Sequence, residues 1–304
     1  MKLGAPVWPF QWHPPYEDAV RRIASLGYRN VELIAWNRQA LEEYYTPGKI
    51  RELRALIADE GLELSEFVST AGAMSSADAA ERNGVVEYFK RFCETARELG
   101  TGTVNTVAPM PFGLRIPPLK QLPTSQIWTV DVPEGLDWQR GWDEFVDTMR
   151  RVVAVVEDAG LRYAVEPHPY RYVANADGML RLCDLIPSPA LGINYDPSHT
   201  FPCGDMPQVA IYRLGSRVFH CHFSDNDALT NAHWRPGMGK IDWRALLKAL
   251  HAVGYDGTLS IELEDVPDVA TGSRPVAGPL FDEEMSLTRE YLQECSQGLG
   301  ITWE

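Results

Sequence analysis

Short apolar runs alternate with helix-length amphipathic runs along the whole 304-residue chain. Apolar runs of this kind are typical of buried strands, whereas apolar residues spaced three and four apart are typical of helices packed on a sheet. Eight runs are predicted to be strands: 3–8, 30–35, 62–69, 103–108, 162–168, 191–196, 218–223 and 258–264. Helices are expected near residues 16–26, 47–60, 81–99, 138–159, 175–186, 206–214, 243–253 and 282–298. Eight β–α units in one chain predict an α/β fold, a single-domain (β/α)8 TIM barrel spanning residues 1–304.

The predicted helices carry ordinary end signals. Thr46 stands before Pro47 as an N-cap before a first-turn proline, and Asp242 is placed to cap the helix expected from residue 243. A glycine just after a helix can adopt the left-handed conformation that ends it. Five predicted helices end in this way, at Gly27, Gly61, Gly100, Gly160 and Gly254.

Two long segments interrupt this alternation. Residues 109–137 contain six prolines, and residues 266–281 are rich in Pro, Gly and Ser. Both follow a predicted strand, so both belong on the C-terminal face of the barrel, where the active sites of this fold are built. Loops of this length are commonly functional, and we expect a substrate lid or a partner contact there.

The charge balance excludes one class of partner. Lys and Arg total 28 and Asp and Glu total 42, which gives a formal net charge of −14. Binding a nucleic acid requires clustered cations that neutralise phosphates, so we expect no nucleic-acid partner. We expect no signal peptide, because residues 1–8 lack a basic segment followed by an apolar one, and the chain has no run of about 20 apolar residues that could cross a bilayer. Five widely spaced cysteines without a C-x-x-C pair indicate reduced thiols, and we expect a cytoplasmic protein without membrane association.

Carboxylates and imidazoles gather where the last four predicted strands emerge into their loops. The segments are RYAVEPHP, LGINYDPSH, VFHCHFSDND and TLSIELED. Carboxylates that converge on one barrel mouth repel one another, and a bound divalent cation removes that conflict. Mixed oxygen and nitrogen donors suit Mn2+, Mg2+, Co2+ or Fe2+, while Zn2+ is not excluded. His220 and His222 face the same side of their strand, so one of them could instead be a hydrogen-bonded core residue.

These segments, together with PGMGKIDW and GYDGTLSIELED, resemble the xylose isomerase-like TIM-barrel superfamily of sugar phosphate isomerases and epimerases over essentially the whole chain. The resemblance implies that one divalent metal, Mn2+ first of all, is held by Glu166, Asp196, His222 and Glu262. It also implies that His199 contacts the substrate. In the ketose 3-epimerases of the family the two ligand glutamates act as the acid/base pair, which implies a catalytic role for Glu166 and Glu262.

The chain departs from those ketose epimerases at two places. They carry a second Glu where Tyr172 stands here, and an Arg within an E-x-N-R segment where this chain reads SDNDAL. The runs PHPYRY, DPSHTFPCGD and HWRPGMGKIDW are similar to the catalytic subunits of bacterial C-glycoside deglycosidases. That similarity implies a lyase that cleaves 3-oxo-C-glycosides by β-elimination, in an oligomer with a small β-type partner subunit. The alternative is a sugar or keto-sugar isomerase or epimerase.

Each of these reactions begins when a base removes a proton next to a carbonyl group. His168 and His199 are the imidazoles nearest the expected ligands, and one of them is the predicted base, with the ligand glutamates as the alternative. His233 and Arg235 are candidate substrate-binding or acid residues, or ordinary loop residues.

Further candidates lie on the early strands. An apolar platform for a sugar face or an aromatic group could be formed at the end of the first strand by Trp8, Phe10, Trp12 and His13, or these residues could simply pack at the barrel mouth. Substrate hydroxyl groups could be bound by Glu32 and Glu66, on the second and third predicted strands.

Two rival functions fit the same fold less well. An apurinic-site endonuclease would need more metal-binding residues on the early strands and a basic face for DNA, and the net charge is −14. A non-catalytic barrel that serves only as an assembly subunit would have no need to keep the acidic residues together.

Overall fold

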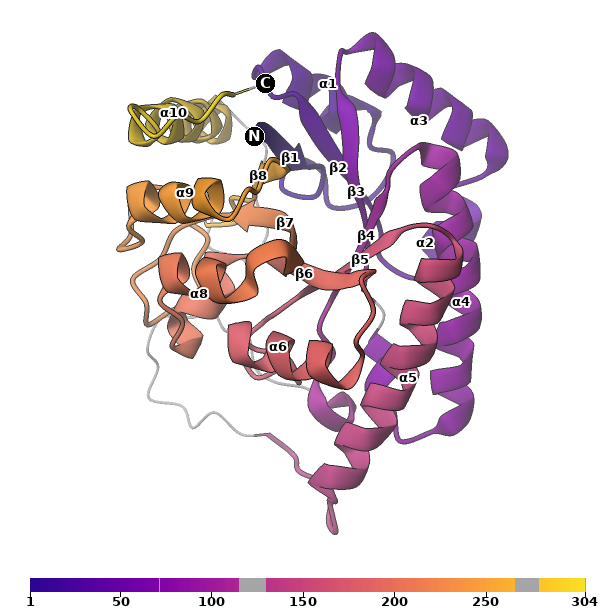
Figure 1. Ribbon diagram of the computed structural model, residues 1–304. Helices are drawn as coiled ribbons and strands as arrows, with labels where there is room; N and C mark the ends of the chain where they lie inside the picture. Colours follow the sequence, from indigo (N-terminus) through magenta and orange to yellow (C-terminus); the bar gives the residue numbers. More distant parts are fainter. Residues whose placement is uncertain (71, 115–129, 266–278, 304) are drawn as a thin grey trace.

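In the computed structural model, which describes residues 1–70, 72–114, 130–265 and 279–303, parallel strands close into a barrel in sequence order (Figure 1). This confirms the predicted (β/α)8 fold. The strands are β1 (Lys2–Pro6), β2 (Asn30–Ala35), β3 (Glu63–Ser69), β4 (Thr103–Val107), β5 (Arg162–Glu166), β6 (Leu191–Tyr195), β7 (Val218–Phe223) and β8 (Thr258–Ile261).

Each predicted helix is present within a few residues of its expected ends. They are α1 (Glu17–Ser25), α3 (Pro47–Asp59), α4 (Ala79–Leu99), α5 (Trp138–Asp158), α6 (Ala176–Leu185), α8 (Pro207–Leu214), α9 (Trp243–Ala252) and α10 (Pro279–Cys295). Two short helices were not predicted, α2 (Arg38–Glu43) and α7 (Pro197–Thr200). The 3-10 turns are η1 (Gly72–Ser75), η2 (Pro111–Gly113), η3 (Phe201–Cys203) and η4 (Gly215–Arg217).

The predicted helix ends are confirmed in detail. The Thr46 side chain accepts a hydrogen bond from the Lys49 amide at 3.3 Å, and Asp242 accepts one from the Ala245 amide at 3.0 Å. Gly100 ends α4 with a φ of 98°, the left-handed conformation that its lack of a side chain permits.

Several strands end earlier than the apolar pattern predicted, β8 by three residues and β5 by two. β5 stops at Glu166 because Pro167 has no amide hydrogen to continue the ladder. β8 stops at Ile261, and the next residues turn toward the loop after β7. There the amides of Glu264 and Asp265 both donate to the carbonyl oxygen of His233 at 3.2 Å.

The interior of the barrel contains a buried polar layer. Successive side chains of a strand alternate between its two faces, so Asn194 lies one layer below Asp196, His220 below His222 and Ser260 below Glu262. The polar side chains buried in this lower layer include Glu32, Glu66, Asn105, Asn194, His220 and Ser260. The apolar core lies instead mainly between the strands and the helices, so the charged residues of the strands meet inside the barrel.

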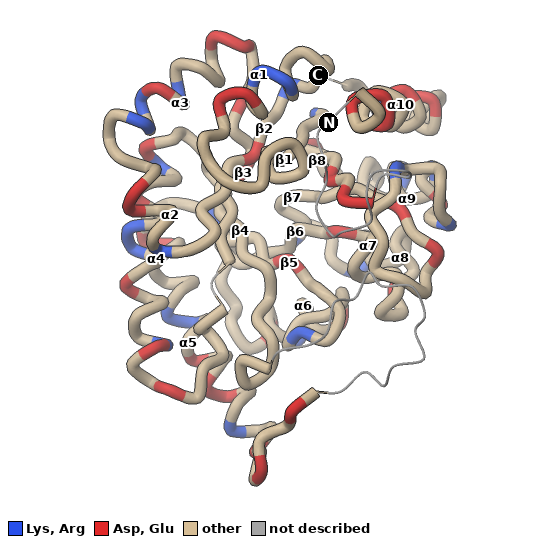
Figure 2. The backbone as a smooth tube through the Cα atoms, turned by 180° about the vertical axis from the view of Figure 1, so that it is seen from behind, with Lys and Arg blue, Asp and Glu red and all other residues tan. Residues whose placement is uncertain are grey.

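The long segments 109–137 and 266–281 fall mostly outside the described residues, and their predicted role as a lid or partner contact stays a prediction. Within the described residues, none of the helices combines the length and hydropathy that crossing a bilayer requires. Figure 2 shows Lys and Arg interspersed with Asp and Glu along α3, α4 and α5, without a continuous basic stripe on those helices.

Close packing of β6 on β7 gives a test of the barrel. A Cβ atom added to Gly192 would lie 2.5 Å from the carbonyl oxygen of Arg217. Gly192→Ala should therefore lower the free energy of unfolding by about 1–3 kcal/mol, because backbone must move to relieve the clash. Urea unfolding measures this change.

The matched control is Gly84→Ala in α4, where an added Cβ meets nothing within 4 Å. That variant should gain about 0.5–1 kcal/mol, since alanine favours a helix. Equal stability of the two variants would contradict the strand packing described here.

Candidate metal centre

Four buried side chains from the ends of β5, β6, β7 and β8 converge inside the barrel. Glu166 is the last residue of β5, Asp196 follows β6 as the N-cap of α7, His222 lies in β7 and Glu262 follows β8. Each offers one donor atom, and these atoms all lie within 4.8 Å of one another. The structure thus brings together the four residues that the sequence placed at neighbouring strand ends.

His222 lies at the centre of this group. Its Nδ1 atom is 2.8 Å from Oε1 of Glu166 and 3.0 Å from Oε2 of Glu262. Burial lowers the pKa of His222, but the carboxylates of Glu32, Glu166 and Glu262 outweigh burial and hold the pKa well above its ordinary value. Without a metal, a proton on Nδ1 therefore balances part of the negative charge.

The carboxylates of the centre retain free coordinating oxygens. Oδ1 of Asp196 accepts hydrogen bonds from the amide and hydroxyl groups of Ser198 at 2.7 and 2.6 Å. Oε1 of Glu262 accepts one from the indole of Trp8 at 2.6 Å. Among the described residues, the buried atoms Oδ2 of Asp196 and Oε2 of Glu262 accept no hydrogen bond, although Nδ1 of His222 lies 3.0 Å from Oε2 of Glu262.

This arrangement fits a divalent cation. Buried polar atoms are nearly always satisfied, and a cation among the four donors would satisfy both orphaned oxygens. Three carboxylates and one imidazole form a donor set suited to Mn2+, Mg2+, Co2+ or Fe2+. The four-residue cluster is thus the candidate metal centre.

A second acidic pair lies below the centre, and one of its members contacts His222. Glu32 accepts hydrogen bonds from Nε2 of His220 at 2.8 Å and from Nε2 of His222 at 2.9 Å. Glu66 accepts one from Asn105 at 3.0 Å, and burial raises its pKa to about 7. Both glutamates are fully buried. The expectation that Glu32 binds substrate hydroxyl groups does not fit this placement, because imidazoles occupy both of its oxygens.

Three further imidazoles line one side of the metal centre. The rings of His168 and His199 stack with centroids 3.5 Å apart, and the ring of His233 lies 4.6 Å from that of His199. The Nε2 atoms of His199 and His233 are each 3.6 Å from Oδ2 of Asp196. His168 and His233, both named from the sequence, thus lie beside the candidate ligands.

Burial holds the pKa of His168 and of His199 well below the ordinary value. The positive charge of Arg171 adds to this effect on His168, and His168 adds to it on His199. Both imidazoles are therefore neutral at neutral pH and able to accept a proton.

Two contributors to the site were missed by sequence reasoning. Oδ1 of Asn231 accepts a hydrogen bond from Nδ1 of His199 at 2.8 Å, which leaves Nε2 of that ring as the proton acceptor. Asn231 lies in an irregular loop, where no periodic signal marks it. Trp8 was expected as an apolar surface, whereas its indole N–H holds Glu262.

Other substrate-binding candidates lie apart from the four donors. Trp12 is half-buried and stacks on Trp36 with ring centroids 4.3 Å apart, and His13 is exposed. Arg235 donates to Glu284 of α10 at 3.0 Å, which ties the loop after β7 to the last helix. The structure gives each of these residues a packing or tethering contact or an exposed position, and their contact with substrate stays a prediction.

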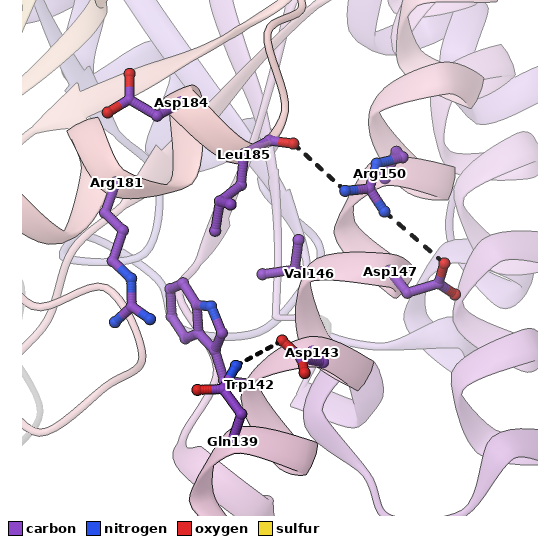
Figure 3. Close-up of a pocket in the computed structure, with 9 residues that line it drawn as sticks. All are labelled: Gln139, Trp142, Asp143, Val146, Asp147, Arg150, Arg181, Asp184 and Leu185. Carbon is purple, nitrogen blue, oxygen red and sulfur yellow. Dashed lines mark hydrogen bonds and ion pairs between the residues drawn. The ribbon is translucent and has the colours of Figure 1, made fainter.

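A hollow of about 540 Å3 on the outer surface lies away from this chemistry. It is lined from α5 and α6 and includes Trp142, Asp143, Asp184 and Leu185, with the guanidinium of Arg181 3.9 Å from the centre of the Trp142 ring (Figure 3). No member of the metal centre lines it. The hollow therefore has no part in the chemistry of the centre.

Residues 20–291 match the family model of the xylose isomerase-like TIM barrel. A similar curated protein is fructoselysine 3-epimerase of Escherichia coli O157:H7, which is 23% identical over 256 residues, 82% of this chain and 86% of that protein.

Solved structures share the fold at lower identity. D-psicose 3-epimerase from Clostridium cellulolyticum H10, crystallised with D-tagatose, aligns with a TM-score of 0.76 at 19% identity, over 97% of this chain and 99% of the other. The 3-keto-D-glucoside 4-epimerase of E. coli aligns with a TM-score of 0.73 at 18% identity, over 97% of this chain and 100% of the other.

The raised pKa of His222 predicts how many protons are released when a metal binds. A cation must displace the proton from Nδ1, so binding of Mn2+ near pH 7 should release about one proton per chain. Titration calorimetry in two buffers with different protonation enthalpies measures that proton. The apparent affinity should also fall about tenfold for each pH unit of acidification. A binding enthalpy independent of the buffer would contradict a protonated His222 in the metal-free centre.

Proposed function

The chain belongs to the xylose isomerase-like TIM barrel family, and from that premise we propose that it is a divalent-metal-dependent enzyme that epimerises or isomerises a keto sugar. The observation that carries the proposal is the cluster of Glu166, Asp196, His222 and Glu262 beside neutral imidazoles. It combines a cation site with proton acceptors, as proton transfer next to a carbonyl group requires.

The four clustered residues would hold the metal, and Mn2+ is the first candidate. When bound, such a cation stabilises the negative charge that develops on a carbonyl oxygen as the neighbouring proton leaves. The protein contributes the fixed orientation of the donors. Trp8 holds one oxygen of Glu262, and Ser198 holds one oxygen of Asp196.

We assign proton transfer to the imidazoles that line one side of the metal centre. Nδ1 of His199 donates its hydrogen to Oδ1 of Asn231, so Nε2 of the same ring carries the lone pair that can accept a proton. His168 has an Nε2 atom without a hydrogen-bond partner among the described residues, 3.6 Å from Oε2 of Glu166. Either imidazole can remove a proton that lies next to a carbonyl group, and Glu166 and Glu262 are the alternative pair.

The substrate class proposed is a keto sugar that carries a second group. Two similar proteins are named for such compounds, fructoselysine and a 3-keto-D-glucoside. At both places where this chain departs from the ketose epimerases, side chains have packing or hydrogen-bonding roles within the protein. Tyr172 stacks on Phe145 with ring centroids 4.8 Å apart. In the SDNDAL segment, which contains no arginine, Asp225 accepts hydrogen bonds from Gly237 and Trp243. Recognition of a free ketose through an acid and an arginine at these positions is therefore not expected.

Cleavage of a 3-oxo-C-glycoside is the second candidate, and the third imidazole favours it. A base takes the C2 proton, the electron pair forms the C1–C2 double bond, and the group at C1 leaves with its bonding electrons and takes up a proton. The reaction needs both a base and an acid, and Nε2 of His233 lies 3.4 Å from Nε2 of His199. A small partner subunit and an oligomeric assembly belong to this proposal.

Solvent deuterium exchange tests the step that both candidates share. The Mn2+-loaded protein should exchange the hydrogen next to the carbonyl group of a 3-oxo-glucoside for deuterium in 2H2O, because the base returns a solvent-derived proton. Mass spectrometry measures the exchange and also detects an epimer or a released aglycone. EDTA-treated protein is the control. Absence of exchange with 3-oxo-O-glucosides, 3-oxo-C-glucosides and free ketohexoses alike would refute the proposal.

Two imidazole variants identify the base. His168→Ala and His199→Ala should both keep the wild-type metal content, and the variant that lacks the base should lose about 100-fold or more in kcat. Metal analysis and initial rates on the same preparations provide the comparison. His251→Ala, at an exposed position in α9, is the matched control. Losses below about tenfold for both site variants would assign the base to the ligand glutamates.

A further inference from the structure

The fully buried carboxylate of Glu32 joins two imidazoles on β7 from the opposite side of the barrel. Its Oε1 atom lies 2.8 Å from Nε2 of His220, and its Oε2 atom lies 2.9 Å from Nε2 of His222. These side chains are each at most 2% exposed. Both contacts have the length of a charge-assisted hydrogen bond, and Glu32 lies on β2, remote in sequence from β7.

We propose that Glu32 is a positioning residue that fixes the ring of His222, so that its Nδ1 atom faces the metal. The inference rests on the proposed metal centre. An ionised carboxylate only accepts hydrogen bonds, so each Nε2 atom must carry the hydrogen. On the other side of the His222 ring, Nδ1 then offers its lone pair between Glu166 and Glu262, at 2.8 and 3.0 Å.

The geometry favours this role over a second cation site in the same layer. A cation would need the imidazole lone pairs, whereas both Nε2 atoms lie at hydrogen-bond distance from Glu32. Oε2 of Glu66, the remaining acid, is 4.0 Å from both Nε2 atoms, too far for a hydrogen bond to either. The layer is thus a hydrogen-bonded support beneath the metal centre.

Glu66 provides the matched control. It pairs with Glu32 in the register between β2 and β3, is equally buried, and accepts a hydrogen bond from Asn105 but none from His222. Substitution by glutamine keeps the shape of either side chain. In Glu32→Gln, one of the two oxygens that face the imidazoles becomes an NH2 donor. One of the two Nε2–H groups then loses its acceptor, and the hydrogen-bonded bridge that holds the His222 ring is broken.

The test compares Mn2+ binding by titration calorimetry in wild-type protein, Glu32→Gln and Glu66→Gln, with circular dichroism to verify folding. Glu32→Gln should weaken binding by about 10- to 100-fold, as loss of a carboxylate behind a ligating histidine does. Glu66→Gln should change it less than about threefold. An unchanged affinity in Glu32→Gln, equal losses in the two variants, or two Mn2+ ions per wild-type chain would overturn the assignment.

A spectroscopic measurement on wild-type protein keeps the inference testable if Glu32→Gln does not fold. In protein loaded with diamagnetic Zn2+, 15N NMR should show the proton of His222 on Nε2 and the metal on Nδ1. The reverse pattern would overturn the role of Glu32 and leave the proposed function intact. Wild-type protein that binds neither Mn2+ nor Zn2+ would instead refute the metal centre itself, and the inference with it.

Discussion

Charge compensation among buried carboxylates is the constraint on which the rest of this structure depends. The barrel interior holds Glu32, Glu66, Glu166, Asp196 and Glu262, each at most 7% exposed. Isolated buried carboxylates are strongly disfavoured, so each must be neutralised, hydrogen-bonded or paired with a cation. Among the described residues, His222 meets three of these acids, with contacts of 3.0 Å or less to Glu32, Glu166 and Glu262. His220 also contacts Glu32, at 2.8 Å, but two imidazoles cannot balance five acids, and a bound divalent cation would make up the deficit.

The barrel fixes where these charged side chains lie relative to one another. Because side chains on a strand alternate between two faces, residues two apart on β7 place one imidazole in each of two stacked polar layers. The upper layer offers donors to a cation, and the lower layer holds the upper one in place through Glu32. The flanking His168 and His199 stay neutral for the same physical reason, since burial opposes a further charge. One environment therefore offers both a candidate cation site and neutral imidazoles that can accept a proton.

The alternation of apolar runs was sufficient to predict the closed barrel, since the eight strand–helix units leave little freedom in the connections. The same pattern predicted that carboxylates and imidazoles gather at one end of the barrel, because strand ends in a barrel share one face. The choice of the four candidate ligands among them rested on the resemblance to the family. The hydrogen-bond partners of Glu32 could not be predicted, because sequence periodicity places a residue on a face of its strand without revealing its partners. Those partners, His220 and His222, lie 188 and 190 residues away. Asn231 could not be predicted, because it lies in an irregular loop whose path depends on tertiary contacts.

The central claim is that the excess of buried negative charge holds one divalent cation at the ends of β5 to β8. Anomalous diffraction from crystals grown with Mn2+, collected on both sides of the manganese absorption edge, tests it most directly. The account predicts a single strong peak within coordination distance of Glu166, Asp196, His222 and Glu262. A peak between Glu32, Glu66 and His220 instead, or no ordered manganese within the barrel, would contradict it.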